Sequence, residues 1–254
     1  MKKFILNNYT LYSFGIVFVF ILWVIFSSTL GQGNLYFPSP LETFKKLGEI
    51  LSDSYIYISI GWTLLRTLIG FLSSLFVAMI FGLLAGTFNH VYTFLKPLMT
   101  VFKSMPTAAL VFLFLVLSGS KYAPVFIVFL VSFPILYESI VGGIKSVPQD
   151  INDMLKIDTN GRLKPMLIVK VPISLPYIIV GLASSFALAV KSTIMAEIIT
   201  GDTGYGLGNA IRAYRSLDPT DLTPIFAISV VAITLVLIVD LIGMIINKHY
   251  DINK

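Results

Sequence analysis

The chemistry open to this chain is limited first by the side chains that it lacks. Its 254 residues include no cysteine, which excludes disulfides, thiolate catalysis and cysteine-based metal sites. The only histidines, His90 and His249, lie in separate segments, and there is no HExxH motif. The glycine-rich stretch 201–208, GDTGYGLG, lacks the Gly-Lys-Ser/Thr ending with which a P-loop holds phosphates. The sequence therefore predicts no catalytic residue, no metal site and no cofactor in this chain.

Four charged residues interrupt long apolar runs: Lys103, Glu138, Lys191 and Glu197. A charge at the centre of a membrane helix costs about 2.5–3.5 kcal/mol on insertion scales, so each of them requires a partner or water. We expect Lys103 and Glu138 to lie at equal depth on adjacent antiparallel helices and to pair near a cytoplasmic gate. All four are candidates for a pathway or a gate.

No acidic residue is expected at the depth of Lys191. This lysine either faces a wet pathway, where it would attract an anion, or extends its side chain outward to the interface. Arg66 lies at the start of its own apolar run, close to the outer interface, and is expected to be solvated there. These expectations depend on helices that cross a membrane.

Composition supports a membrane environment. Hydrophobic residues make up 56% of the chain, charged residues only 12%, and the mean hydropathy is +0.89. Soluble domains carry roughly 25% charged residues, so this chain has too little polar surface to cover a soluble globule. Its net charge of +5 comes from dispersed basic residues without aromatic interleaving, which excludes a nucleic-acid partner and leaves membrane lipid.

The apolar segments are long enough for helical spans, which need about 20 residues each. We therefore expect an all-α integral membrane protein with about six transmembrane helices. The alternating ten-residue segments of a membrane barrel are not seen. The first run is longer than the core of a signal peptide and has no typical cleavage site, so we interpret it as a retained helix. The expected spans are roughly 11–30, 64–87, 97–118, 123–144, 174–197 and 223–246.

The distribution of basic residues predicts the orientation. With the N-terminus inside, ten of the 18 Lys and Arg residues fall on the cytoplasmic side and five on the outer side. Cytoplasmic loops retain Lys and Arg, so we expect a multi-pass protein of the bacterial inner membrane with both termini in the cytoplasm. The five basic residues placed outside are Lys45, Lys46, Lys121, Arg212 and Arg215.

The cytoplasmic loop 145–173 is too long for a simple turn. Ser146 can cap a helix, Gln149 can complete a capping box, and Pro148 is tolerated in a first turn. A short helix through about Ile157 is expected, followed by a turn at Asn160-Gly161.

This loop resembles the cytoplasmic loop of binding-protein-dependent ABC importer permeases, whose pattern is Glu-Ala-Ala, three residues, Gly, and an Ile-x-Leu-Pro-like ending. Asp153 takes the acidic position, and Leu175-Pro176 form the ending. Met154-Leu155 replace the alanine pair, and Thr159 stands where the family has glycine; Gly161 provides a turn slightly later.

Further motifs resemble the nitrate, sulfonate and taurine branch of these permeases, and the likeness runs from about residue 38 to 246. They are Pro38-Ser39-Pro40, Thr63 to Phe71, Lys96-Pro97, Lys103 to Pro106, Met195 to Ile199 and Thr203 to Gly208. In the resemblance, Glu197 takes the family's acidic position and is expected to anchor the glycine-rich loop.

The resemblance implies a type I ABC importer permease fold and a homodimer of permease copies. It also implies cytoplasmic ABC ATPase subunits that bind ATP and Mg, and an extracytoplasmic substrate-binding protein. Residues 1–37 would form an N-terminal transmembrane helix with an external loop, and 38–254 the core permease domain. The coupling helix would occupy about 147–159. Its ATPase-coupling residues would be Pro148, Asp150, Asp153, Lys156, Thr159 and Gly161.

Several alternatives remain open. The loop could be an ordinary amphipathic segment at the lipid interface. The chain could be a secondary transporter or channel not driven by ATP, although no internal repeat is evident. The resemblance implies a small solute such as a sulfonate, nitrate, taurine or a thiamine precursor. Small residues recur every four positions at 70–86 and 181–193, and they mark packing faces within one subunit or between two.

Overall fold

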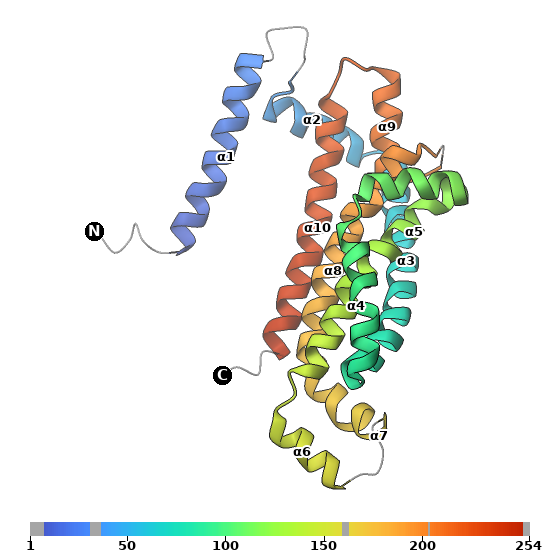
Figure 1. The fold of residues 1–254 in the computed structure, drawn as a ribbon. Helices are drawn as coiled ribbons and strands as arrows, with labels where there is room; N and C mark the ends of the chain where they lie inside the picture. The colour runs from blue at the N-terminus through green and yellow to red at the C-terminus, as the bar shows by residue number, and fades with distance from the viewer. Residues whose placement is uncertain (1–7, 31–36, 159–162, 203, 251–254) are drawn as a thin grey trace, which may run out of the picture. The chain divides into compact units, whose positions relative to one another are not determined.

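The computed structural model describes residues 8–30, 37–158, 163–202 and 204–250. The chain divides into two compact units, each formed by two stretches of sequence. The first contains residues 1–57 and 210–232, and the second contains 58–209 and 233–254. Figure 1 gives the order of the helices, and the expected all-α membrane fold is confirmed.

The first unit contains α1 (Asn8–Leu30), α2 (Pro40–Leu51), most of α9 (Leu207–Leu217) and the start of α10 (Thr223–Tyr250). A capping box begins α2: the Ser39 hydroxyl accepts from the Glu42 backbone N–H, and the Glu42 carboxylate accepts from the Ser39 N–H. The indole Nε1 of Trp23 donates to the Pro38 carbonyl at 3.1 Å, which ties α1 to the segment before α2.

The second unit contains α3 (Ser54–Thr87) from Ile58 on, and three further long helices pack in it. These are α4 (Asn89–Ser104), α5 (Thr107–Lys145) and α8 (Val171–Thr200). Between α5 and α8 lie α6 (Gln149–Asp158), α7 (Leu163–Pro165) and the π-helical turn η1 (Met166–Lys170). Figure 1 shows α6 beyond the end of α5, apart from the long helices of this unit.

Four helices in the described residues are long and apolar enough to cross a membrane: 54–87, 107–145, 166–200 and 223–245. The apolar part of α1, Ser13–Thr29, is shorter. The third expected span, 97–118, is wrong as a single helix. Pro106 has no backbone N–H and restricts Met105 to an extended conformation, so α4 ends at Ser104 and α5 begins at Thr107.

A second break lies inside α5 at Gly119, whose φ of 77° and ψ of 169° are not helical. The positive φ is readily adopted by glycine, which has no Cβ to clash with the backbone. The chain therefore passes from α4 through a short helical segment, 107–118, before the longer helix that ends at Lys145.

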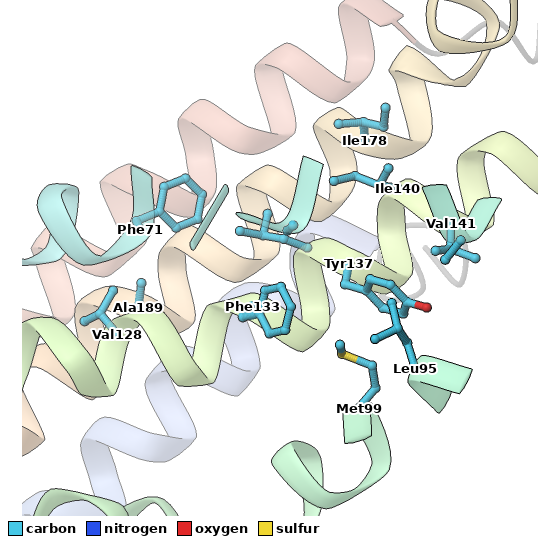
Figure 2. Close-up of a cluster of buried hydrophobic side chains, with 13 residues drawn as sticks. Phe71, Leu95, Met99, Val128, Phe133, Tyr137, Ile140, Val141, Ile178 and Ala189 are labelled. Carbon is cyan, nitrogen blue, oxygen red and sulfur yellow. The ribbon is translucent and has the colours of Figure 1, made fainter. Parts of the chain in front are cut away.

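The core of the second unit is formed by side chains from α3, α4, α5 and α8 (Figure 2). Phe71 comes from α3 and Met99 from α4, while Phe133 and Tyr137 come from α5 and Ile178 from α8. Every one of these side chains is at most 6% exposed. This cluster fixes α5 as the central helix against which the others pack.

Both small-residue stripes pack inside one chain. A Cβ placed on Gly82 would lie 2.9 Å from Ile140, and one on Gly86 would lie 2.7 Å from Ile144, so α3 lies against α5. On α8, a Cβ on Gly181 would lie 2.1 Å from the Ser139 hydroxyl of α5. Small residues allow this close approach, as expected for membrane helices.

The loop 145–173 begins differently from the expectation. Ser146 does not cap α6; it ends α5, donating its hydroxyl to the Gly143 carbonyl at 2.8 Å. The Asn152 side chain donates instead to the carbonyls of Val147 and Pro148, and these two hydrogen bonds support the first turn of α6. The expected short helix is present as Gln149–Asp158.

Candidate functional site

The acidic residue Glu197 lies near the end of α8 and is 1% exposed. Its carboxylate accepts from the Arg66 guanidinium at 2.8 Å and from the Thr63 hydroxyl at 2.9 Å, both on α3. It also accepts from the backbone N–H of Gly208 at 3.0 Å. A buried charge needs such compensation, and here an opposite charge and two hydrogen-bond donors provide it.

Residues 205–208, which follow α8, pack against this carboxylate and its partners on α3. A Cβ at Gly206 would lie 2.7 Å from the carboxylate atoms of Glu197, and one at Gly208 would lie 2.4 Å from the Ile194 carbonyl. Arg66 also donates to the Tyr205 carbonyl at 2.6 Å, and the N–H of Leu207 donates to Thr63 at 2.8 Å. The glycines therefore permit a contact that any side chain would block.

Arg66 corrects one expectation. It is 7% exposed rather than solvated, and a second acid, Asp202, lies 3.6 Å from it. The local apolar pattern could not reveal this, because Arg66 and Glu197 are 131 residues apart in the chain. Thr63 was also missed as a partner. The available signal in the sequence was the four-residue spacing of Thr63 and Thr67, which places both on the same face of α3. In the structure, Thr67 contacts Thr193 of α8 at 2.7 Å.

Lys103 at the end of α4 and Glu138 on α5 form an ion pair in the structure. Their side chains are 42% and 51% exposed, so the pair lies on the surface of the unit. The expected contact is therefore present, and the role of these residues in a gate stays a prediction.

Lys191 lies on an exposed face of α8. Tyr177, Val180, Ser184 and Leu188 lie on the same face at helical spacing, and all are exposed. Within the described residues, the Lys191 ammonium group has no hydrogen bond or ion pair. The place of Lys191 in a pathway stays a prediction.

Of the expected ATPase-coupling residues, Asp150 and Asp153 are exposed on α6, and Pro148 is exposed directly before it. Lys156 is part of the same helix. Thr159 and Gly161 lie outside the described residues. The helix also exposes 69% of Met154, so it presents both acidic and apolar groups.

In the part of the chain that the structure describes, no group of three His, Cys, Asp or Glu side chains could hold a metal ion. Glu138 lies within α5, one of the long apolar helices, and pairs with Lys103 near the end of α4, while Glu197 near the end of α8 pairs with Arg66 of α3. Such an arrangement fits a membrane transport subunit.

Comparison with known proteins also indicates a membrane transport subunit. Residues 78–252 match the family described as the binding-protein-dependent transport system inner membrane component. The chain belongs to this family. It is the transmembrane permease subunit of an ABC importer, a multi-pass membrane protein and a transport subunit rather than an enzyme.

Curated relatives include two cyanobacterial permeases. The nitrate import permease protein NrtB of Leptolyngbya laminosa is 28% identical over 200 residues, covering 78% of this chain and 70% of that protein. The bicarbonate transport system permease protein CmpB of Synechococcus elongatus is 29% identical over 206 residues, with coverages of 76% and 73%.

Two solved structures share the fold. One is the MetNI methionine ABC transporter, with a TM-score of 0.67 and 14% identity over 77% of this chain and 95% of that chain. The other is an amino acid ABC transporter, with a TM-score of 0.63, 17% identity and coverages of 80% and 97%.

Proposed function

We propose that two copies of this chain form the translocation pathway for a small anion, and that partner ATPase subunits drive import. The membership of the permease family carries this proposal. Two copies are needed because the few long helices of one chain cannot easily enclose a pathway. ATP and Mg would be bound by the partner ATPase.

The helix α6 is the proposed contact with the ATPase. It is short, it extends beyond the end of α5 (Figure 1), and it exposes Asp150 and Asp153. A rigid element of this kind can receive motion from a neighbouring subunit. An extracytoplasmic binding protein would deliver the solute on the opposite side, and both termini would lie in the cytoplasm.

Two observations support an anionic solute. Lys191 is exposed on a span and has no acidic partner among the described residues. In addition, the relatives named above are nitrate and bicarbonate permeases. A cation in a wet pathway attracts anions and lowers the electrostatic barrier that they meet.

The proposal is tested in cells that lack the gene and in cells in which it is restored. Restored cells should accumulate isotope-labelled nitrate or bicarbonate in an ATP-dependent manner, and a Lys191→Gln variant should lose at least severalfold in uptake rate. Uptake that continues after depletion of ATP would contradict an ATP-driven importer. Two results together would contradict the anionic pathway: a neutral solute taken up as fast as the anions, and unchanged uptake of both anions in the Lys191→Gln variant.

A further inference from the structure

Among the described residues, two ion pairs join long helices of the second unit, and they differ in the number of partners that hold them. Glu197 has an opposite charge, a hydroxyl and a backbone N–H as partners, and the side chains of its pair with Arg66 are only 1% and 9% exposed. Lys103 and Glu138 have only each other among the described residues, and both are about half exposed. The first pair is fixed, while the second can open without losing any other bond.

The position of the second pair argues against contact with lipid. Glu138 lies seven residues before Lys145, the end of α5, which is about 10 Å along the axis. The helix from Gly119 to Lys145 is about 39 Å long, longer than the roughly 30 Å hydrocarbon core of a bilayer. An exposed charge at this depth is costly unless it faces water or protein.

The neighbouring face of α4 is also polar. Lys96, Thr100 and Lys103 recur at intervals of four and three residues, which places them on one side of the helix, and all three are exposed. Glu138 faces Lys103 at the end of this row. A row of exposed polar side chains on a helix that packs against a membrane span is typical of a face that lines water.

We propose that Lys103 is a binding position for the transported anion and that Glu138 competes with the anion for the Lys103 ammonium group. Glu138 pairs with Lys103 when the anion is absent, and by pairing again it releases a bound anion. This inference rests on the proposed function, because it requires an anionic solute. It makes Lys103 a specificity-determining residue and Glu138 a residue that sets the rate of release.

The physical reason is the balance that any pathway needs between binding and release. A site must attract an ion strongly enough for it to enter and weakly enough for it to leave. A free lysine at this depth would retain an anion. A carboxylate that competes for the same ammonium group weakens the net binding, and Lys103 is never left without a negative partner.

The test uses proteoliposomes that contain the complete complex of the chain with its ATPase and binding protein, and measures initial uptake of isotope-labelled nitrate and bicarbonate. Glu138→Gln removes the competitor, so KM should fall about two- to fivefold and kcat should fall as well. Lys103→Gln should raise KM. Glu138→Asp, which keeps the competing charge, should restore a KM close to that of the wild type.

The matched control is Glu49→Gln, which opens the exposed Lys46–Glu49 pair on α2, where the two groups are 2.8 Å apart. The hydrogen bond from Lys46 lowers the pKa of Glu49, so the Glu49 carboxylate is charged at neutral pH. Uptake should not change in this variant. Equal amounts of assembled complex are verified for every variant by size-exclusion chromatography.

The outcomes separate the two proposals. ATP-driven uptake of an anion by the wild type, with an unchanged or raised KM in Glu138→Gln, would overturn the competitor role alone. If the pair is purely structural, both single variants will lower the amount of assembled complex without opposite shifts in KM. That result would also overturn the competitor role of Glu138. ATP-driven uptake of only neutral solutes would overturn both the anionic pathway and the role of Lys103.

Discussion

The buried carboxylate of Glu197 is held by several partners at once. An opposite charge on α3, a threonine hydroxyl and the backbone N–H of Gly208 at the start of α9 all meet at one carboxylate. Removing one partner of a buried ion pair leaves an uncompensated charge, which is far more costly than losing an exposed pair. The cluster thus ties α3 and α8 to the glycine-rich segment that follows α8.

Substituting Glu197 by Gln should therefore destabilise the protein by about 3–5 kcal/mol, because Arg66 would remain buried without its main counter-charge. The measurement is the apparent melting temperature of the detergent-purified protein. Glu49→Gln on the exposed face of α2 serves as the matched control and should leave it unchanged. Equal effects of both substitutions would show that the buried cluster has no special role in stability.

Sequence reasoning identified one half of this cluster. Glu197 could be predicted as a loop anchor because it precedes the glycine-rich segment and matches a family position. Its partner Arg66 could not, because hydropathy places an arginine near the end of an apolar run at the interface. Only the packing of α3 against α8 brings the two together.

At the scale of the element, the small residues of α3 have a defined partner. A Cβ on Gly70 would lie 2.6 Å from the Val125 carbonyl and 2.7 Å from the Val128 side chain. Gly61, on the same helix, has nothing within 4 Å of such a Cβ. The same substitution at these two positions should therefore have opposite effects.

Gly70→Ala should destabilise the protein by about 1–3 kcal/mol, because the added methyl group overpacks the contact with α5. Gly61→Ala should stabilise it by about 0.5–1 kcal/mol, because alanine is a better helix former and the site is open. Thermal denaturation of the two variants in detergent compares them directly. If Gly70→Ala is as stable as Gly61→Ala, the packing of α3 on α5 is not as described.

The helix α6 supports a functional prediction at the same scale. Asp153→Lys should weaken assembly with the ATPase or uncouple hydrolysis from transport, because the reversed charge would face the group that receives the carboxylate. Hydrolysis of ATP and uptake are measured with and without loaded binding protein. Glu42→Lys is unsuitable as a control because Glu42 caps α2, whereas Glu49→Lys changes an exposed acid outside α6 and should preserve coupling. Normal uptake by Asp153→Lys would remove α6 from the coupling mechanism.

The sequence predicted the elements better than their interruptions. Long apolar runs identified α3, α5, α8 and α10, because helical spans need about 20 such residues. The break at Pro106 lies inside one of these runs, and hydropathy alone does not register it. Ser146 fits the start of a helix as well as the end of one, and the structure uses it at the end of α5.

At the scale of the whole molecule, the sequence predicted the all-α membrane class and the permease family. The residue-level likeness to the nitrate, sulfonate and taurine branch depended on several moderate motifs in the expected order. Neither the division into two units nor the uneven lengths of the membrane helices could be read from composition, because both depend on contacts between distant segments.

The proposed orientation gives a further prediction. A cysteine introduced at His249 should be protected from membrane-impermeant thiol reagents added outside intact cells, while one at Asp218 should react. The chain contains no cysteine of its own, so each variant carries a single reactive group. Permeabilised cells provide the control, since both positions should then be labelled. Labelling of both positions in intact cells would overturn the proposed topology.

ATP hydrolysis and solute uptake, measured together in proteoliposomes, test most directly whether this chain is the permease of an ATP-driven importer. The chain, the ATPase subunit and the loaded binding protein are reconstituted, and each is omitted in turn. We expect uptake to require all three and hydrolysis to rise when the loaded binding protein is added. Uptake by the chain alone, driven by an ion gradient without ATP, would contradict the assignment of this protein as the permease of an ATP-driven importer.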